Sequence, residues 1–118
     1  MEHGDRAVNV AALMARLEGD RELLAELVTL YVEDEAGQLA ELERAVERRD
    51  AEAVRRAAHA LKGVVSNFSA PFAEAAAFAL EMAGRHGQLS SAPALVATLR
   101  LELGRVRDAL MALCAGPA

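Results

Sequence analysis

Aromatic residues are scarce in this chain, which has three phenylalanines, one tyrosine and no tryptophan among 118 residues. Hydrophobic residues nevertheless make up 53% of the sequence, and most of them are alanine or leucine, so the core has to be built from aliphatic side chains. Such a composition favours helices packed closely on helices. The single cysteine, Cys114, excludes a disulfide within the chain.

Long apolar runs and an excess of positive charge are also missing. No run approaches the roughly 18 apolar residues that a membrane-spanning helix needs, and the residues that follow Met1 do not resemble a signal peptide. The net charge is −5, with acidic and basic residues interspersed, so no basic stripe is available to follow nucleic-acid phosphates. We therefore expect a cytoplasmic protein with neither nucleic acid nor a membrane as its partner.

Turn signals divide the chain into segments that all have helical periodicity, and no alternating run is long enough for a strand. The sequence therefore predicts an all-α fold. The expected helices run from about Asp5 to Leu17, from about Arg21 to Arg48, from the Asp50 cap to about Asn67, from about Pro71 to Arg85, and from Ser90 and Pro93 to Cys114. Short connections between long helices predict an antiparallel up-and-down four-helix bundle with a short extra N-terminal helix. Residues 1–118 form one domain, with the bundle core at about residues 20–114.

Individual residues mark the expected helix ends. Gly19 is typical of a left-handed helix end, and Asp20 and Asp50 are typical N-caps. Ser69, with Pro71 close behind it, predicts a serine cap for the fourth helix.

The spacing of apolar residues also predicts which faces are buried. The inner face of the fourth helix is expected to be mostly alanine, which would let neighbouring backbones approach closely; its members are Phe72, Ala75, Ala76, Ala79, Met82 and Ala83. The acidic residues Glu33, Asp34 and Glu35 are expected to form a solvated face.

The helix after Asp50 contains one residue that an ordinary bundle does not need. At 100° per residue, seven apolar residues fall within an arc of roughly 120°; they are Val54, Ala57, Ala58, Leu61, Val64, Val65 and Phe68. His59 falls roughly 160° from the centre of that arc, so it is predicted to point into solvent. An exposed imidazole on a rigid helix keeps a nitrogen available for attack, which makes it a usable phosphoryl acceptor.

Several neighbours of His59 fit that chemistry. Lys62 and Gly63 lie one turn further along the same side, where the lysine can reach phosphate oxygens and the glycine leaves space for a partner. A glycine inside a helix costs about 1 kcal/mol relative to alanine, which suggests a steric requirement. Arg55 and Arg56, one turn earlier, add positive potential. A surface histidine is more often an ordinary polar residue, so these neighbours alone leave its role open.

The residues around His59 resemble the signature of histidine-containing phosphotransfer (HPt) domains. The resemblance rests on His59-Ala60-Leu61-Lys62-Gly63, preceded by Arg56-Ala57-Ala58 and followed by Asn67 and Ala70. Residues 16–24 and 31–34 resemble the first and second helices of that family, so the likeness covers nearly the whole chain. One departure is Ser69, where the family commonly has glycine, and we expect the turn into the fourth helix to differ in shape.

The resemblance implies that His59 is phosphorylated, that Lys62 supports the phosphoryl group and that Gly63 leaves room for a receiver domain. Arg55, Arg56 and Ser66 are further candidates for phosphoryl support or partner docking. No carboxylate cluster, phosphate-binding glycine loop or nucleotide motif accompanies them. The resemblance therefore implies a phosphocarrier without a metal or cofactor of its own. A response-regulator receiver domain or a hybrid sensor histidine kinase would supply the aspartate and Mg²⁺.

The sequence leaves several questions open. A helical bundle that binds proteins without phosphoryl chemistry is one alternative, although the presence of His59, Lys62 and Gly63 argues against it. The phosphoacceptor domain of a larger histidine kinase is another, whereas Met1 and a near-complete bundle favour a stand-alone protein. We expect a monomer. The donor, the acceptor, the direction of flow and the imidazole nitrogen that reacts stay undetermined.

Overall fold

The computed structural model describes residues 7–116, and in this part of the chain turns and short loops connect five helices, with no strand. The predicted all-α fold is confirmed. The helices are α2 (Val10–Arg16), α3 (Arg21–Glu47), α4 (Ala51–Asn67), α5 (Pro71–Arg85) and α6 (Ala92–Ala115). The ends of α3 to α6 differ from the predicted ends by one residue at most. None of the helices within residues 7–116 is both long enough and apolar enough to cross a lipid bilayer.

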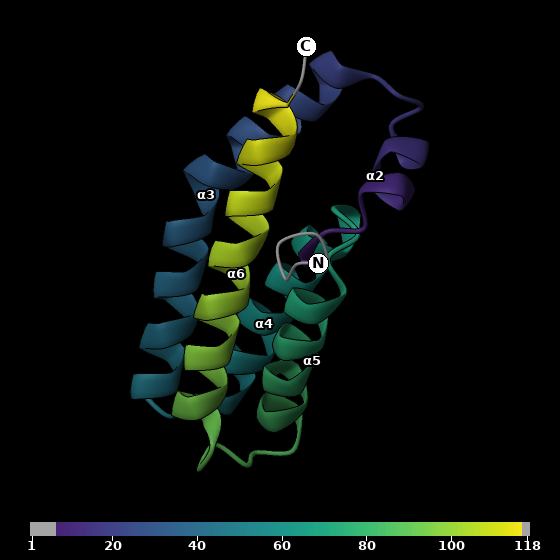
Figure 1. Ribbon diagram of the computed structural model, residues 1–118. Helices are drawn as coiled ribbons and strands as arrows, with labels where there is room; N and C mark the ends of the chain where they lie inside the picture. Colours follow the sequence, from purple (N-terminus) through teal and green to yellow (C-terminus); the bar gives the residue numbers. More distant parts are fainter. Residues whose placement is uncertain (1–6, 117–118) are drawn as a thin grey trace.

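The four longer helices pack in a closed ring, with α3 on α4, α4 on α5, α5 on α6 and α6 on α3. With 27 and 24 residues, α3 and α6 are about 40 and 36 Å long, whereas α4 and α5 have only 17 and 15 residues. The longer pair therefore extends past the shorter pair at one end. Figure 1 shows α2 at that end, beside the protruding part of α3 and α6.

The short helix α2 begins later than predicted. Asn9 is its N-cap, and the Asn9 side chain accepts a hydrogen bond from the backbone N–H of Ala12 at 3.0 Å. The helix cannot run through Asn9 because the backbone N–H of Asn9 donates to the carbonyl oxygen of Ser69 at 2.8 Å. The rest of the predicted start, Asp5 and Arg6, lies outside the described residues. Leu13 is the residue of α2 that enters the core.

The predicted aspartate caps are confirmed. Asp20 and Asp50 accept hydrogen bonds from the backbone N–H groups of Leu23 and Ala53, at 3.0 and 3.1 Å. Gly19 has a φ of +74°, as expected for a left-handed helix end.

The predicted serine cap is wrong. Ala70 is the N-cap of α5 and makes no side-chain cap, although Pro71 does stand at the start of the helix. Ser69 instead has a φ of +58°, and Ala70 donates to the carbonyl oxygen of Val65 at 3.2 Å, so this turn closes the end of α4. Ser69 thus adopts the left-handed conformation that glycine adopts most easily, and the turn keeps a shape suited to glycine.

The core is aliphatic, as the composition predicts. Its fully buried large side chains are Leu13, Leu24, Leu42, Leu61, Leu80, Leu99, Leu103, Leu110, Val8, Val54, Val65 and Val106. The buried face of α4 is confirmed at Val54, Ala58, Leu61 and Val65. Tyr31 meets Phe68 edge-to-face at 5.4 Å between ring centroids, and its hydroxyl donates to the carbonyl oxygen of Leu103 at 3.1 Å.

The predicted inner face of α5 is wrong, because the residues that are buried lie about one position away from the predicted ones. The buried residues of α5 are Ala73, Ala77, Leu80, Glu81 and Gly84, whereas Phe72 is 49% exposed and Ala75 is exposed. The reason lies in the close approach of α5 to α4. A Cβ built on Gly84 would lie 2.6 Å from the backbone nitrogen of Arg55, so this face accommodates small residues and not a phenylalanine.

The acidic run on α3 is only partly solvated. Glu33 and Asp34 are exposed as predicted, but Glu35 is buried, with 5% of its surface exposed. Glu35 belongs to the same stripe as Tyr31 and Leu42, and its Oε1 lies 3.2 Å from a guanidinium nitrogen of Arg107 on α6. Burial raises the pKa of the Glu35 carboxyl, and the charge of Arg107 opposes that shift.

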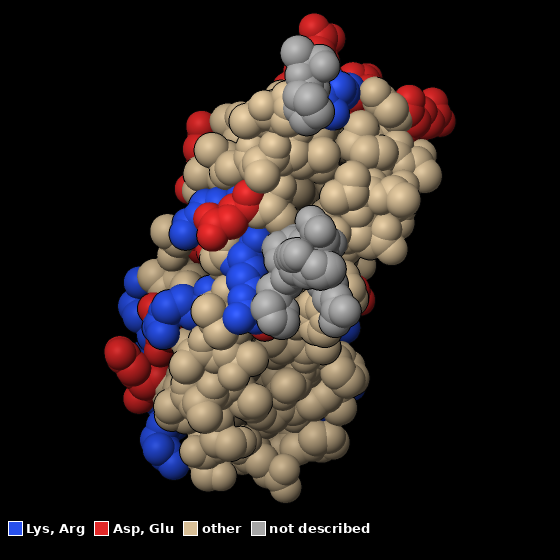
Figure 2. Space-filling model, viewed as in Figure 1, with Lys and Arg blue, Asp and Glu red and all other residues tan. Residues whose placement is uncertain are grey.

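Charged side chains of both signs lie close together on the face shown in Figure 2, whereas the lower part of that face is mostly uncharged. Two ion pairs, Arg100–Glu43 and Arg107–Glu35, join α6 to α3. Arg100 and Arg107 of α6 therefore act within the fold, as links between neighbouring helices.

Replacing Glu35 with glutamine should change how stability depends on pH. A carboxyl whose pKa is raised in the folded state binds protons more tightly there, so its contribution to stability falls as the pH rises through that pKa. The free energy of unfolding of E35Q, measured in urea, should therefore rise relative to that of the native protein as the pH increases above about 4, where an ordinary glutamate ionises. The exposed Glu33→Gln variant is the control. A relative loss of stability in E35Q over that range would contradict the burial argument.

Candidate functional site

His59 lies in the middle of α4 with its side chain 62% exposed, so the predicted solvent orientation is confirmed. The ring is nevertheless not free at both nitrogens. Its Nδ1 lies 3.0 Å from Oε2 of Glu81, which comes from the adjacent helix α5. The histidine is therefore held by one nitrogen while the rest of the ring faces solvent.

Glu81 is a buried carboxylate, with only 4% of its side chain exposed. Its Oε1 lies 2.8 Å from Nζ of Lys62, and its Oε2 lies 3.7 Å from a guanidinium nitrogen of Arg85. The Lys62 ammonium, with help from His59, holds the pKa of the Glu81 carboxyl below its ordinary value against the opposing effect of burial. An ionised carboxylate only accepts hydrogen bonds, so Nδ1 of neutral His59 carries the proton and Nε2 keeps the lone pair.

Glu81 was not predicted from the sequence as a residue of the site. Helix α5 is rich in alanine on every side, so the spacing of its apolar residues did not reveal which face is buried. The signal was present in the stripe Ala73, Ala77, Leu80 and Gly84, on which Glu81 is the single acidic residue. A lone acid on a face of small residues is a residue that needs a charged partner, because burying an unpaired carboxylate is costly.

Lys62 is one turn from His59, as predicted, and its side chain is 25% exposed. Its ammonium contacts Glu81 and lies 5.1 Å from the centroid of the Phe78 ring. Phe78 itself is 49% exposed. In this arrangement the charge of Lys62 acts first on the carboxylate that holds the histidine, and direct support of a phosphoryl group stays a prediction.

Gly63 is exposed, and a Cβ built on it would meet nothing within 4 Å. No packing within the described residues therefore requires a glycine there. Gly84 is the opposite case, because its missing Cβ lets α4 and α5 touch. The space beside His59 is open to a partner, as the steric interpretation of Gly63 requires.

Comparison with known proteins agrees with this geometry. The sequence model of the Hpt domain matches residues 26–109. The chain belongs to the HPt family. The crystal structure of histidine-containing phosphotransfer protein B (HptB) from Pseudomonas aeruginosa PAO1 is similar, with 28% sequence identity and a TM-score of 0.86 over 92% of this chain and 95% of that chain. No curated protein sequence matches significantly.

Membership of the HPt family supports a histidine phosphotransfer role in a phosphorelay, in which HPt domains act as phosphocarriers rather than enzymes. Within residues 7–116, no group of three or more His, Cys, Asp or Glu side chains gathers as a metal site would require.

The other candidate residues of this HPt chain differ in how free their side chains are. Arg55 forms two hydrogen bonds with Glu52, at 2.9 and 2.7 Å, and this pairing is the main cause that lowers the pKa of Glu52 to about 2. Arg56 has a side chain that is 63% exposed, and its closest approach to Glu52 is 3.5 Å. Ser66 is half-buried one turn beyond Lys62. Arg56 is therefore better placed than Arg55 to contact a partner.

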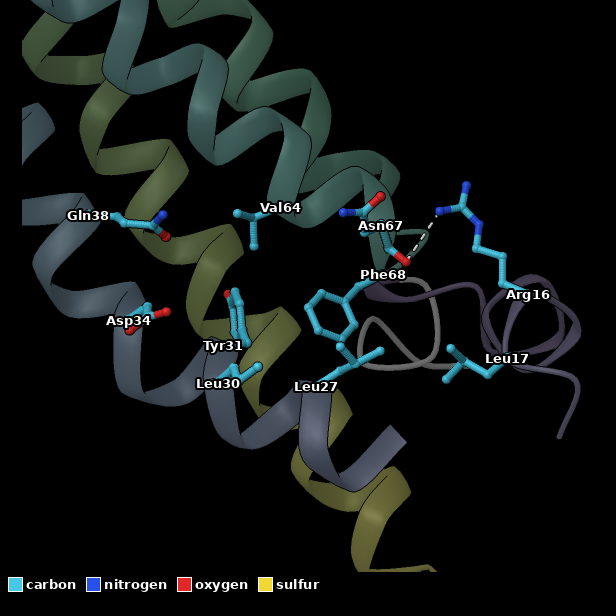
Figure 3. Close-up of a pocket in the computed structure, with 10 residues that line it drawn as sticks. All are labelled: Arg16, Leu17, Leu27, Leu30, Tyr31, Asp34, Gln38, Val64, Asn67 and Phe68. Carbon is cyan, nitrogen blue, oxygen red and sulfur yellow. Dashed lines mark hydrogen bonds between the residues drawn. The ribbon is translucent and has the colours of Figure 1, made fainter. Parts of the chain in front are cut away.

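A groove opens between α2, α3 and the end of α4 of the HPt chain (Figure 3). Its volume is about 420 Å³, and its lining residues are Arg16, Leu17, Leu27, Leu30, Tyr31, Asp34, Gln38, Val64, Asn67 and Phe68. Leu30 is 55% exposed. A guanidinium nitrogen of Arg16 donates to the carbonyl oxygen of Asn67 at 3.3 Å and ties α2 to α4 at one edge of the groove. The groove was not predicted from the sequence, because it forms only when residues of three different helices come together.

Proposed function

We propose that this chain carries phosphoryl groups on Nε2 of His59. The group would come from the aspartate of a receiver domain, or from a kinase, and would pass to the aspartate of a response-regulator receiver domain. The observation that carries the proposal is an exposed histidine on a helix of an HPt domain, with Nδ1 held by Glu81 and Nε2 directed away from that contact.

Transfer to His59 forms one covalent bond, between Nε2 and phosphorus, and breaks one, between phosphorus and the aspartate oxygen. The Nε2 lone pair attacks the phosphorus of the partner's aspartyl phosphate, the P–O bond breaks, and its electron pair returns to the aspartate carboxylate. We infer that the partner also supplies Mg²⁺, since Glu81, the carboxylate that contacts His59 within residues 7–116, is already paired with Lys62. The role of this chain is to present the nucleophile in a fixed orientation.

We also infer that the groove of Figure 3 belongs to the surface on which a receiver domain docks. Asn67 lies two turns from His59 along α4, which is about 12 Å. A stable interface buries about 800 Å² per partner, so one centred near His59 is wide enough to include the groove. The groove is lined by both apolar and polar residues, as interfaces commonly are.

The remaining expectations fit this function. We take the ring of α3 to α6 to be an antiparallel up-and-down four-helix bundle, supported by their short connections and mutual packing. We further propose that the protein acts as a monomer in the cytoplasm, where receiver domains and the cytoplasmic parts of hybrid kinases are accessible to it.

The test is radiolabelled phosphoryl transfer from a panel of phosphorylated receiver domains to the native protein. We expect label that is stable in alkali and labile in acid, as a phosphoramidate requires. Absence of label from every receiver, combined with measurable binding to one of them, would favour the alternative of a protein-binding module without phosphoryl chemistry.

Substitutions at Gly63 should separate stability from transfer. Gly63→Gln should raise the free energy of unfolding by up to about 1 kcal/mol, because the helix gains a better helix former. It should also slow phosphoryl transfer by at least about tenfold, which corresponds to about 1.4 kcal/mol of lost docking or alignment. Urea unfolding and transfer kinetics measure the two effects.

Gly104→Gln is the matched control for Gly63, since a Cβ at Gly104 in α6 also meets nothing within 4 Å. It should stabilise the helix and leave transfer unchanged. Equal transfer rates in the native protein and in Gly63→Gln would remove the steric argument for Gly63.

A further inference from the structure

A small pocket lies between α3 and α4, next to the turn of α4 that carries His59. Its volume is about 220 Å³, and its charged lining residues are Glu41, Arg48 and Arg56. The rest of its wall is formed by four alanines, which are Ala45, Ala53, Ala57 and Ala60. Sites for small molecules begin at about 300 Å³. The pocket therefore has the size of a site for one side chain rather than for a cofactor.

Arg56 connects this pocket to the histidine. It lies three residues before His59, so it is one turn away and about 60° round the helix, on the side of α3. Lys62 lies three residues after His59, about 60° round in the other direction, on the side of α5. The ammonium of Lys62 is already paired with Glu81 at 2.8 Å. A partner that reaches His59 thus meets a paired cation on one side and the pocket on the other.

The two arginines of the pocket are only weakly neutralised. The side chain of Arg56 is 63% exposed, and its contact with Glu52, at 3.5 Å, is with a carboxylate that Arg55 already binds at 2.9 and 2.7 Å. Arg48 is exposed at the end of α3 and forms no ion pair within residues 7–116. Glu41 is the one acidic residue among those that line the pocket. The pocket therefore carries an excess of positive charge.

We propose that this pocket receives an acidic side chain of the receiver domain, and that Arg48 and Arg56 thereby determine which receiver domains dock on this protein. The inference rests on the proposed function and specifies the partner chemistry for it. A guanidinium group donates two parallel hydrogen bonds to a carboxylate, so an aspartate or glutamate that enters the pocket is bound with a defined geometry. The alanine walls carry no polar side-chain group that competes for it.

The charge around the pocket favours an acidic occupant. Residues 44–56 contain five arginines and three acidic residues, a net charge of +2, whereas the chain as a whole carries −5. In the other direction along α3, the exposed Asp34 lines the groove of Figure 3. A receiver domain that places an acidic side chain in the pocket is held in one orientation, because turning it round would bring that acid toward Asp34.

The first measurement is the affinity of the panel of receiver domains for the native protein and its variants, by titration calorimetry. Arg48→Gln and Arg56→Gln should each weaken binding by at least about fivefold. Arg48→Glu should weaken it by at least about thirtyfold, because a like charge then faces the acid of the partner. Arg44→Gln is the control and should bind like the native protein, since Arg44 is exposed one turn earlier on α3 and does not line the pocket.

Charge reversal on both proteins identifies the occupant. Each aspartate and glutamate on the surface of the bound receiver domain is replaced in turn by lysine and titrated with Arg48→Glu. One of these lysine variants should bind Arg48→Glu at least about tenfold more tightly than the unmodified receiver does, and should bind the native protein more weakly. Native affinity in Arg48→Glu, or the lack of any lysine variant that restores binding, would overturn the proposal.

Chemical phosphorylation with phosphoramidate separates this proposal from the proposed function, because it involves no receiver domain. Arg48→Glu should be phosphorylated on His59 at the same rate as the native protein. A changed rate would mean that Arg48 acts on the histidine itself, and would overturn its role in partner choice. Receiver domains that bind but transfer nothing would refute the proposed function, while the affinities still decide on the pocket.

Failure of every receiver domain to bind would overturn the pocket proposal, and phosphoramidate labelling would still show whether His59 accepts a phosphoryl group. Helical content from circular dichroism verifies that each variant is folded. Arg48 and Arg56 are both exposed, so their replacement removes no side chain from the core.

Discussion

Replacing His59 with glutamine should abolish acceptance of a phosphoryl group from any receiver domain. Glutamine can occupy about the same space as the imidazole ring. Its amide nitrogen has no available lone pair, however, so the nucleophile is removed. The loss should exceed about a thousandfold in rate, because covalent transfer through nitrogen has no substitute in the site. Labelling of the native protein and H59Q side by side measures it.

The fold of H59Q should persist, since the histidine side chain is 62% exposed and contributes to no core cluster. Far-ultraviolet circular dichroism and urea unfolding verify this. His86, at the end of α5, supplies the matched control, and His86→Gln should accept label like the native protein. Phosphorylation that survives in H59Q would refute the assignment of the acceptor.

Among the glycine-to-alanine changes in residues 7–116, Gly84→Ala should give the largest loss of stability. The new Cβ would lie 2.6 Å from the backbone nitrogen of Arg55 and 2.7 Å from the carbonyl oxygen of Ala51. Backbone atoms in a helix do not move aside as a flexible side chain does, so α5 has to shift away from α4. Overpacking of this kind costs about 1–3 kcal/mol, more than the gain of about 1 kcal/mol from alanine's helix propensity.

Urea unfolding of Gly84→Ala and Gly104→Ala tests this expectation. Both substitutions give the same chemical change inside a helix, but only the first meets neighbouring atoms. Gly84→Ala should be destabilised and Gly104→Ala slightly stabilised. In Gly84→Ala the contact between His59 and Glu81 should also weaken. Nitrogen-15 NMR of the His59 imidazole would detect that change. A stabilised Gly84→Ala would mean that the helices separate at little cost.

The part of the site on α4 could be predicted from sequence, and the part on α5 could not. On α4, apolar and polar residues segregate clearly, so the orientation of His59 followed from the helical period alone. On α5, alanine occurs on all sides, and the contact of Gly84 with the α4 backbone decides which face is buried. Glu81 could be recognised only when that face was known.

The other differences from prediction have the same kind of cause. Glu35 looked like part of a solvated acidic run, but its partner Arg107 is 72 residues away on α6. The start of α2 depends on the bond from Asn9 to the carbonyl oxygen of Ser69, which no local pattern reveals. Ser69 itself was assigned to the wrong helix end, because a serine before a proline is also the pattern of an N-cap.

The attachment of α2 has a consequence for the dynamics of the groove. This helix has seven residues and contributes only Leu13 to the core, and isolated helices of that length are not stable in water. Its amide hydrogens should therefore exchange with solvent through local opening, whereas the buried amide hydrogens of α3 to α6 should exchange only when the whole domain unfolds. Since Arg16 and Leu17 line the groove, such an opening removes one wall and leaves His59 and Glu81 in place. A partner that fills the groove has to order α2, and this ordering reduces the net free energy of binding. Binding of the partner should therefore slow the exchange of the amide hydrogens of α2.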